Sequence, residues 1–517
     1  MSDTPLPAPN TRAREVWLLA ATFLVAVAGL IYELIAATLS SYLLGDSIRQ
    51  FSLVIGIFLS AMGVGAWLSR FVAQPLSGFI WAQILLGVVG GFMAPALFLH
   101  YAALGSVAAP LYTMLIAIGV LSGMEIPLIA RAMEAVGAFE NRFENVLSVD
   151  YVGALVASVA FPLLVIPHLG LMSASLAFGV LNLLVAGLSI YLFREHVTKA
   201  MVVVWAVALI GAIYGLVQSE RLVAITETQL FEDDVILTEA TPYQQITVTR
   251  YRERTRLFLN HSIQFDSLDE HRYHEPLVHP VMALAPRRAN VLILGGGDGM
   301  AVREVLRYAD VETITLVDLD PRVTEIFRDH PDLSLLNDKS LSDPRVDIQN
   351  GDAWQFVEKN SRVFDVIIVD LPDPKTVALS KLYSRQFYGL LMERLSAQGL
   401  MVTQAGSPFF ARQAFWSIAN TLESTRNPQA PGKDLGVIAY HSYVPSFGEW
   451  GFVISGPHLP ADRGLQLPQG LSYLTPEIWQ AAQVFGADMD RIEAEANTMQ
   501  AHPLVAYYLD GWDYWFR

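Results

Sequence analysis

The chain has 517 residues, of which 53% are hydrophobic and only 16% charged, and it contains no cysteine. This composition is too apolar for an ordinary soluble protein, and the lack of cysteine excludes disulfide bonds, thiolate metal sites and a cysteine nucleophile. Residues 219–517 hold 26 basic and 40 acidic residues, and this net charge of −14 argues against nucleic-acid binding and is compatible with a cationic ligand.

The N-terminal half contains apolar runs that are long enough for transmembrane helices, which need about 20 such residues each. We expect a tail over 1–15 and then a membrane domain over 16–219 with about seven helices. One helix is expected at 16–44, one at 51–69 and one at 200–219. Two more are expected within 71–124, and another two within 151–193, with a turn near 167–170. The sequence therefore predicts a multi-pass protein of the cell membrane that is embedded in the lipid bilayer.

The charges of this half leave its orientation open. Most Lys and Arg residues of the expected loops share a side with the N-terminus, which favours a cytoplasmic N-terminus. Seven crossings would then place the C-terminal half outside the cytoplasm. Three carboxylates, Glu33, Glu125 and Asp150, lie within or at the edges of the apolar runs. Ionisable groups there either pair with polar partners between helices or serve a function.

After residue 219 the pattern changes. Alternating stretches such as 245–251 and 256–260 predict a small β-rich subdomain over 220–280. From 281 to 517, apolar strands alternate with helical patterns, which is typical of a mostly parallel sheet with helices on both faces. The predicted fold class is a multi-span α-helical membrane domain followed by an α/β Rossmann-like domain of the methyltransferase type, with the small β-strand subdomain at its N-terminal side.

The strongest local motif is the strand and turn VLILGGGDG at 291–299. Glycines let a ligand approach the backbone closely, and an acid about 20 residues later, here Asp318 or Asp320, can hold ribose hydroxyls. The sequence NGDA at 350–353 is placed to reach an adenine edge. Together these motifs predict a nucleoside site, whereas the glycines alone would also suit a tight strand-to-helix turn.

Asp298, within this turn, bears on which nucleoside binds. A carboxylate there repels the pyrophosphate of NAD and the methionine carboxylate of S-adenosylmethionine. Decarboxylated S-adenosylmethionine has lost that carboxylate and ends in an ammonium group, which Asp298 would attract. The alternative is that Asp298 caps the following helix.

Two further acids follow the strand predicted at 364–370. The sequence FDVIIVDLPDP places Asp370 and Asp373 at the carboxyl end of a buried strand, where ligands of open α/β sheets bind. Two carboxylates at this position suit a substrate with two positive charges. The alternative is a turn that uses both acids as caps.

The sequence resembles the spermidine synthase (polyamine aminopropyltransferase) family, in particular its membrane-embedded members with an N-terminal helical region. The similarity covers most of 235–517, and AGLIYELI at 28–35 is similar to the helical region. The matching motifs are TPYQ at 241–244, QFDSLDEHRYHEPLVH at 264–279, GGGDG at 295–299, VDLD at 317–320, NGDA at 350–353, DLPDP at 370–374, LYSRQFY at 382–388, GLMVTQ at 399–404 and WGF at 450–452.

The resemblance implies transfer of the aminopropyl group of decarboxylated S-adenosylmethionine to a diamine such as putrescine, giving spermidine and methylthioadenosine. It implies that Asp370 is the proton acceptor and that the groups around the substrate amines are Gln264, Tyr273, His274, Asp298 and Asp373. The implied nucleoside contacts are Gln244, Asp318, Asp352 and Ala353. We expect no metal and no cofactor, with decarboxylated S-adenosylmethionine as co-substrate, and the resemblance suggests a homo-oligomer.

Three departures from the family pattern leave the identity of the amine open. Asn260-His261 replaces the usual Asp-Gly, Val377 replaces a proline of many members, and Phe447 replaces the tyrosine of soluble members. Two other functions also stay open. One is a polyamine transporter or sensor whose synthase-like domain binds ligand without turnover. The other is a methyltransferase that uses S-adenosylmethionine, which Asp298 disfavours.

Overall fold

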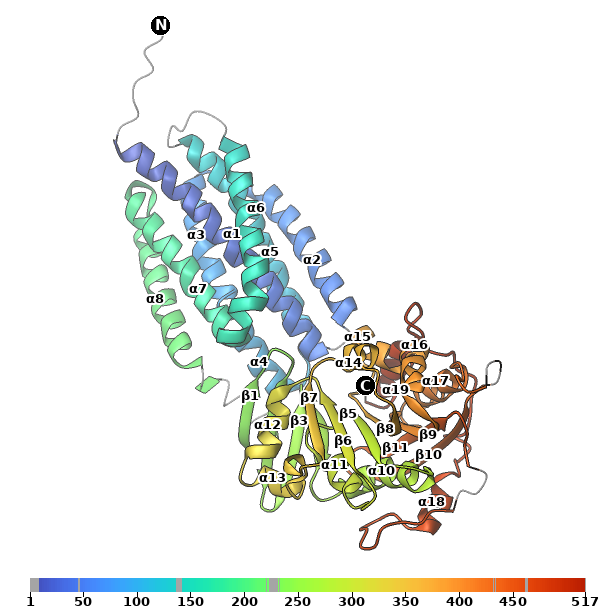
Figure 1. Ribbon diagram of the computed structural model, residues 1–517. Coiled ribbons are helices and arrows are strands. Elements are labelled where there is room, and N and C mark those ends of the chain that lie inside the picture. The colour runs from blue at the N-terminus through green and yellow to red at the C-terminus, as the bar shows by residue number, and fades with distance from the viewer. Residues whose placement is uncertain are drawn as a thin grey trace. The chain divides into compact units, whose positions relative to one another are not determined.

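The computed structural model describes residues 9–44, 47–135, 142–219, 221–222, 231, 233–430, 432, 434–460 and 464–516. The chain divides into two compact units, Met1–Asp234 and Val235–Arg517 (Figure 1). We call them the helical unit and the α/β unit, and each is described by itself.

The helical unit is built from long apolar helices. Its elements are α1 (Pro9–Leu44), α2 (Ser47–Ser69), α3 (Pro75–Val89), α4 (Met93–Leu104), α5 (Ala108–Ala135), α6 (Arg142–Ala160), the π-helix η1 (Phe161–Val165), α7 (Ile166–Leu192), the 3-10 turn η2 (Arg194–His196) and α8 (Lys199–Val217). The first helix begins at Pro9, since proline is well suited to a first helical turn. It therefore takes in the later part of the segment predicted as a tail, whose residues 1–8 lie outside the described residues.

Six helical stretches of the described residues are long and apolar enough to cross a membrane. They are Ala13–Ser41, Arg49–Ser69, Pro75–Leu104, Ala108–Glu134, Phe143–Leu192 and Lys199–Val217. The stretch Phe143–Leu192 has 50 residues and is interrupted at Gly170, whose φ of 67° and ψ of 176° are not helical. Helix α6 packs on α1, and α7 packs on α1, α3 and α8. The sequence predicts a turn at this place. The seven expected helices correspond to the six stretches when the two parts of Phe143–Leu192 are taken as separate helices.

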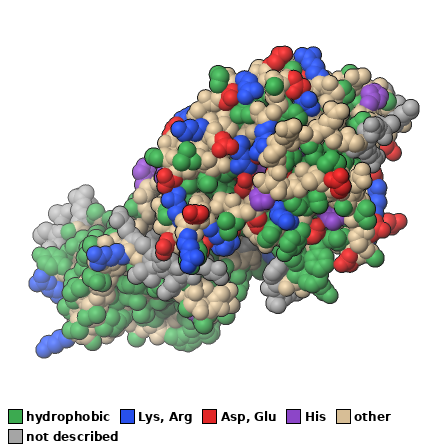
Figure 2. All heavy atoms as spheres, turned by 90° about the horizontal axis from the view of Figure 1, so that it is seen from below, with side chains coloured by type: hydrophobic (Ala, Val, Ile, Leu, Met, Phe, Trp, Pro, Cys, Tyr) green, Lys and Arg blue, Asp and Glu red, His purple; other side chains and the backbone are tan. Residues whose placement is uncertain are grey.

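The surface of the helical unit is unusually apolar. Large hydrophobic side chains are exposed on several of its helices, among them Leu59, Leu155, Leu163, Val207, Ile210 and Val217. Figure 2 shows hydrophobic side chains over much of this unit, whereas acidic and basic side chains are interspersed over the α/β unit.

The α/β unit is organised around a seven-stranded sheet with the order β10-β11-β9-β8-β5-β6-β7. Strands β5 to β9 run parallel, and the β10–β11 hairpin joins antiparallel to β9. The strands are β5 (Asn290–Gly295), β6 (Thr313–Asp318), β7 (Val346–Asn350), β8 (Phe364–Asp370), β9 (Leu395–Gln404), β10 (Gly436–Val444) and β11 (Gly448–Gly456). This sheet confirms the predicted Rossmann-like architecture.

Helices cover both faces of the sheet. They are α10 (His271–Leu284), α11 (Met300–Val305), α12 (Pro321–Asp329), α13 (Leu333–Leu336), α14 (Ala353–Lys359), α15 (Val377–Ser380), α16 (Arg385–Glu393), α17 (Arg412–Glu423), α18 (Pro476–Ala482) and α19 (Pro503–Phe516), with the 3-10 turns η3 (Ser340–Ser342) and η4 (Lys381–Tyr383). Alternate residues of each strand point to opposite faces. Val291 and Ile293 of β5 therefore join the core on the side of α10 to α12, and Leu292 and Leu294 join the core on the side of α16 and α17.

A second sheet of four strands precedes α10. Its strands are β1 (Asp234–Ala240), β2 (Gln245–Tyr251), β3 (Arg254–Leu259) and β4 (Ser262–Asp266), and they pair in chain order. Ile246, Val248 and Phe265 pack into the same core as α10 and the large sheet. The strands predicted within 220–280 thus belong to the α/β unit and have no separate core, and the expected boundary after residue 280 falls inside α10. Residues 223–230 of that segment lie outside the described residues.

Candidate active site

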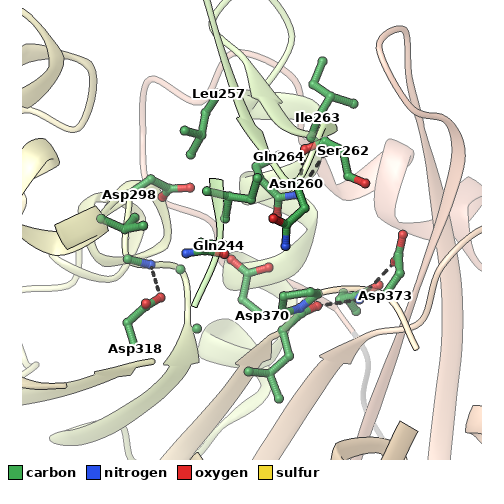
Figure 3. Close-up of a pocket in the computed structure, with 18 of the residues that line it drawn as sticks. Gln244, Leu257, Asn260, Ser262, Ile263, Gln264, Asp298, Asp318, Asp370 and Asp373 are labelled. Carbon is green, nitrogen blue, oxygen red and sulfur yellow. Dashed lines mark hydrogen bonds between the residues drawn. The ribbon is translucent and has the colours of Figure 1, made fainter. Parts of the chain in front are cut away.

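A cavity of about 400 Å³ lies at the carboxyl ends of four strands of the large sheet. Gly295, Asp318, Asp370 and Gln404 are the last residues of β5, β6, β8 and β9, and all four line it. The opposite wall comes from the small sheet, from the start of α10 and from the β10–β11 turn. In Figure 3 the side chains of Asp298 and Asp318 lie on one side of this cavity and that of Asp373 on the other.

The glycine turn follows from the close approach of β5 and β8. Gly295 has a φ of 81°, and a Cβ atom there would lie 1.9 Å from the backbone oxygen of Asp370. Only glycine fits this position without displacing a strand. Within the turn, the Gly297 amide donates a hydrogen bond of 3.0 Å to Asp318 Oδ2, and the Gly299 amide donates one of 2.9 Å to the Gly296 carbonyl. The predicted ribose acid therefore also braces the turn.

Asp298 and Asp318, which lie on the same side of the cavity, both have raised pKa values. Burial raises the pKa of Asp318 to about 6, and the charges of Asp298 and Asp320 add to this, although backbone hydrogen bonds oppose it. Burial also raises the pKa of Asp298, against the attraction of His274. Asp298 Oδ1 accepts a hydrogen bond of 2.9 Å from the Met300 amide. Asp298 thus satisfies the first backbone amide of the short helix α11, whose N-cap residue is Gly299, and it lines the cavity as well.

Asp370 lies on the cavity floor beside α10. The hydroxyl of Tyr273 donates a hydrogen bond of 2.6 Å to Asp370 Oδ1. Burial raises the pKa of this carboxyl to about 6; the nearby charge of Asp298 acts in the same direction, and His274 and the Tyr273 hydroxyl act against it. The result is a carboxylate that is a stronger base than an aspartate in water and is held in place by one buried tyrosine.

His274 is a cationic group whose charge acts on both Asp298 and Asp370. Its Nδ1 lies 2.8 Å from Glu270 Oε2, and Glu270 in turn accepts two hydrogen bonds of 2.8 and 2.9 Å from Arg303. Burial lowers the pKa of His274, but the hydrogen bond and charge of Glu270 outweigh this effect and raise it to about 8. Glu270 and Arg303 therefore fix both the orientation and the charge of a cavity residue.

Asp373 lies in the loop after β8, at the far end of the cavity. Tyr508 of α19 donates a hydrogen bond of 2.7 Å to Asp373 Oδ2, and Gln404 Nε2 lies 3.4 Å from Asp373 Oδ1. On the same loop, Lys375 donates a hydrogen bond of 2.7 Å to the Ser262 hydroxyl. Polar contacts from β4, β9 and α19 thus converge on this loop.

Eight of the ten predicted site residues line this one cavity, namely Gln244, Gln264, Tyr273, His274, Asp298, Asp318, Asp370 and Asp373. Gln244 is held by Asp320, at 3.1 Å, and Gln264 bonds to the Ser262 carbonyl at 3.0 Å. The structure does not bring Asp352 and Ala353 into the cavity wall. The Asp352 carboxylate turns to its own helix, where it accepts from the Gln355 amide at 2.9 Å, because an aspartate at the start of α14 is a favourable cap.

Asn260 and His261, which replace the usual Asp-Gly pair, lie in a tight turn. Asn260 and His261 connect β3 to β4 and have φ values of 48° and 64°. Two-residue hairpin turns of this kind need positive φ at both positions, which asparagine tolerates and histidine adopts less often. Asn260 remains in the cavity wall, so the substitution changes a side chain that faces the ligand space.

Sequence reasoning missed three residues that act on the site. Glu270 stands four residues before His274, and this helical spacing is a signal that could have indicated the pair. Arg303 bonds to Glu270, which lies 33 residues earlier in the chain. Tyr508 bonds to Asp373, which lies 135 residues earlier. No local pattern marks contacts of that separation.

The fold and the site define a class of protein. It is an α/β protein with a glycine turn suited to a nucleoside and a row of carboxylates suited to a cationic group beside it. Among the described residues, no three His, Asp or Glu side chains are arranged to hold a metal ion.

Comparisons with known proteins give the family. Residues 270–454 match the family model of the spermine/spermidine synthase domain. The chain is 40% identical over 493 residues to a polyamine aminopropyltransferase of Leptospira interrogans, with 95% of this chain and 97% of that protein covered. It is 41% identical to polyamine aminopropyltransferase 1 of Ralstonia nicotianae, with 98% and 97% covered. A spermidine synthase structure from Thermotoga maritima matches 49% of this chain and 85% of its own at 24% identity, with a TM-score of 0.44.

The chain therefore belongs to the polyamine aminopropyltransferase family. The sequence-based prediction of the family, and with it of an enzyme of the aminopropyltransferase class, is confirmed.

Proposed function

We propose that this protein transfers the aminopropyl group of decarboxylated S-adenosylmethionine to a diamine such as putrescine, giving spermidine and methylthioadenosine. The observation that carries the proposal is that Asp298, Asp370 and Asp373 line one cavity beside the glycine turn. Three carboxylates that line one cavity are costly unless cations neutralise them. The two substrates would bring three ammonium groups and a sulfonium.

The nucleoside of the donor lies against the glycine turn in this proposal. Gln244 and Asp318, which line the cavity, bind the nucleoside. Asp352 and Ala353, which are not among the lining residues, contact the adenine. Asp298 pairs with the ammonium of the aminopropyl group. S-adenosylmethionine itself would place a second carboxylate near Asp298, and this repulsion argues against a methyltransferase.

The acceptor amine lies between Asp370 and Asp373, with Gln264, Tyr273 and His274 around it. The distal ammonium pairs with Asp373, and the proximal nitrogen points at the aminopropyl carbon that is bonded to sulfur. A new bond forms from this nitrogen to the carbon, the carbon–sulfur bond breaks, and its electron pair stays on sulfur, so that methylthioadenosine leaves uncharged. Asp370 takes the proton that the nitrogen gives up.

The raised pKa of Asp370 supports this role. A primary amine has a pKa of about 10.4 and an ordinary aspartate about 3.9, so proton transfer between them costs about 9 kcal/mol in water. With the Asp370 pKa at about 6, the same transfer costs about 6 kcal/mol. Desolvation of the bound amine lowers its own pKa and reduces the difference further.

We further propose that the helical unit spans the cell membrane. Its six long apolar stretches and its exposed hydrophobic side chains support this assignment, because a large apolar surface needs a non-aqueous environment. The lipid bilayer is then a partner of the chain, and the strand-rich segment is a candidate surface for a homo-oligomer. The names of the relatives disfavour a transporter or sensor without turnover, since all those cited here are transferases.

The experiment that tests the function supplies purified protein with decarboxylated S-adenosylmethionine and a panel of diamines and identifies products by mass. We expect methylthioadenosine and an aminopropylated amine in equal amounts. Asp370→Asn should lower turnover by about 100-fold or more while donor binding is retained. Asp347→Asn, which removes an exposed carboxylate from β7, is the matched control. Donor binding without any amine product in the wild type would instead favour a non-catalytic sensor.

A further inference from the structure

The last two long helices of the helical unit, α7 and α8, enclose a groove of about 440 Å³. The two helices pack along each other (Figure 1), and the short turn η2 joins them. The groove shares no lining residue with the cavity that holds Asp370. The proposed aminopropyl transfer therefore gives it no role.

The part of the groove that runs along the two helices is apolar. Ile190 of α7 and Val202 and Trp205 of α8 line it. The Trp205 ring packs closely on Gly187, where an added Cβ would lie 2.6 Å from the ring, and its Nε1 donates a hydrogen bond of 2.7 Å to the Leu183 carbonyl. Trp205 is thus a fixed wall, and this part of the groove suits a hydrocarbon chain.

The end of the groove at the connection between the helices is basic. Arg194 and Lys199 line it, and within the part of the chain that the structure describes neither side chain makes an ion pair or a hydrogen bond. The Arg194 guanidinium carbon lies 4.5 Å from the centre of the Tyr191 ring, which holds it at the groove. Its N–H donors match the oxygens of a phosphate. The N-terminal end of α8, which Thr198 caps, adds the positive end of a helix dipole.

The acid of this connection is already paired. Glu195 forms an ion pair of 2.7 Å with Arg14 of α1, and the groove lining contains no carboxylate among the described residues. The basic end therefore has no group that would hold a cationic headgroup. The ion pair also shows that this end lies beside the start of α1, on the side where most Lys and Arg of the expected loops lie. Basic pockets between transmembrane helices on such a side bind anionic lipid headgroups.

We propose that this groove binds an anionic phospholipid of the bilayer. Its phosphate lies at Arg194 and Lys199, and an acyl chain lies along Val202 and Trp205. A free phosphate would use only the basic end, whereas a lipid also covers the apolar part, and this favours the lipid as the occupant. The inference rests on the proposed membrane-spanning role of the helical unit and is independent of the aminopropyl transfer.

The test uses the full chain, purified in a non-ionic detergent. Phosphatidylglycerol or phosphatidylcholine with the same acyl chains is titrated in, and native mass spectrometry measures the bound lipid. We expect the wild type to bind phosphatidylglycerol about tenfold more tightly or better, because the choline ammonium would lie beside two cations. Arg194→Gln and Lys199→Gln should each weaken phosphatidylglycerol binding about fivefold and change phosphatidylcholine binding little. Val202→Phe, which narrows the apolar part, should weaken the binding of both lipids.

Two exposed residues outside the groove lining provide matched controls. Arg70 lies over the Trp67 ring at 4.5 Å, so Arg70→Gln removes a similar arginine from the same unit. Ile210 is an exposed residue of α8, so Ile210→Phe adds the same bulk elsewhere on that helix. Both control variants should bind phosphatidylglycerol as the wild type does.

Three outcomes would overturn the inference. They are equal affinity of the wild type for the two lipids, equal losses in Arg194→Gln and Arg70→Gln, and displacement of bound phosphatidylglycerol by millimolar inorganic phosphate, which would show a site for a free anion. Each of them leaves the assignment of the helical unit to the membrane intact. Release of the chain from membranes by an alkaline carbonate wash would overturn that assignment and the inference together, whereas the assay for methylthioadenosine tests the transfer separately.

Discussion

We expect Asp370 to set the acid limit of the proposed reaction. Burial and the charge of Asp298 raise its pKa to about 6, and only its deprotonated form can take a proton from the amine. Because the acceptor binds as a cation throughout this range, kcat/KM should fall about tenfold for each pH unit below about 6 and level off above it. Initial rates at low acceptor concentration, over a pH series at constant ionic strength, measure this limit. A limit near the ordinary pKa of aspartate would contradict the role of burial.

We expect Glu270 to influence this limit through His274. Burial lowers the pKa of His274, but the hydrogen bond and charge of Glu270, with the charges of Asp298 and Asp370, raise it to about 8. In Glu270→Gln the imidazole becomes neutral at a lower pH, so it no longer opposes the rise of the Asp370 pKa. The acid limit of kcat/KM should therefore move to higher pH, by up to about one unit.

The matched control for that variant is Glu325→Gln, which changes an exposed glutamate of α12. It should leave the pH profile unchanged. If Glu270→Gln lowered kcat at every pH by the same factor, Glu270 would have only a structural role. The displacement of the limit is what marks it as a positioning residue.

The turn between β5 and α11 depends on glycine at its first position. Gly295 has a φ of 81°, and an added Cβ would lie 1.9 Å from the Asp370 backbone oxygen. Gly295→Ala should therefore destabilise the α/β unit by about 2 to 4 kcal/mol, as the sum of strain at positive φ and overpacking, and should abolish donor binding. Thermal unfolding and a donor-binding titration measure the two effects.

Gly389→Ala is the control for that substitution. Gly389 lies in α16, and a Cβ there would meet no atom within 4 Å. Alanine favours a helix over glycine by about 1 kcal/mol, so this variant should be as stable as the wild type or slightly more stable. A Gly295→Ala protein with unchanged stability and donor affinity would show that β5 and β8 can separate at little cost.

At the scale of the whole molecule, the charges and the apolar surface are divided between the two units. The helical unit exposes large hydrophobic side chains, and residues 219–517 carry the net charge of −14. The full chain should therefore stay in the membrane fraction during washes with high salt or alkaline carbonate and should be released by detergent. Salt screens a purely electrostatic attachment and has little effect on an apolar one. Recovery of the chain in the salt wash would contradict the assignment to the bilayer.

The sequence by itself determined much of the architecture, because the signals concerned are local. Apolar runs of about 20 residues indicate the long helices, and the break at Gly170 follows the expected turn. Alternation of strands and helices predicts the parallel sheet. Since parallel strands end at one edge of the sheet, the sequence alone predicts that Asp318 and Asp370 lie near the glycine turn.

The tertiary structure alone decided the environment of these groups. Tyr508 of α19 reaches Asp373 across 135 residues of sequence, so this contact depends on how α19 packs in the folded chain. The hydrogen bond from the Gln355 amide to Asp352 could not be predicted from the NGDA motif, because the motif does not show where the following helix begins. A raised pKa likewise depends on burial and on neighbours from several elements, which only the packing of the chain brings together.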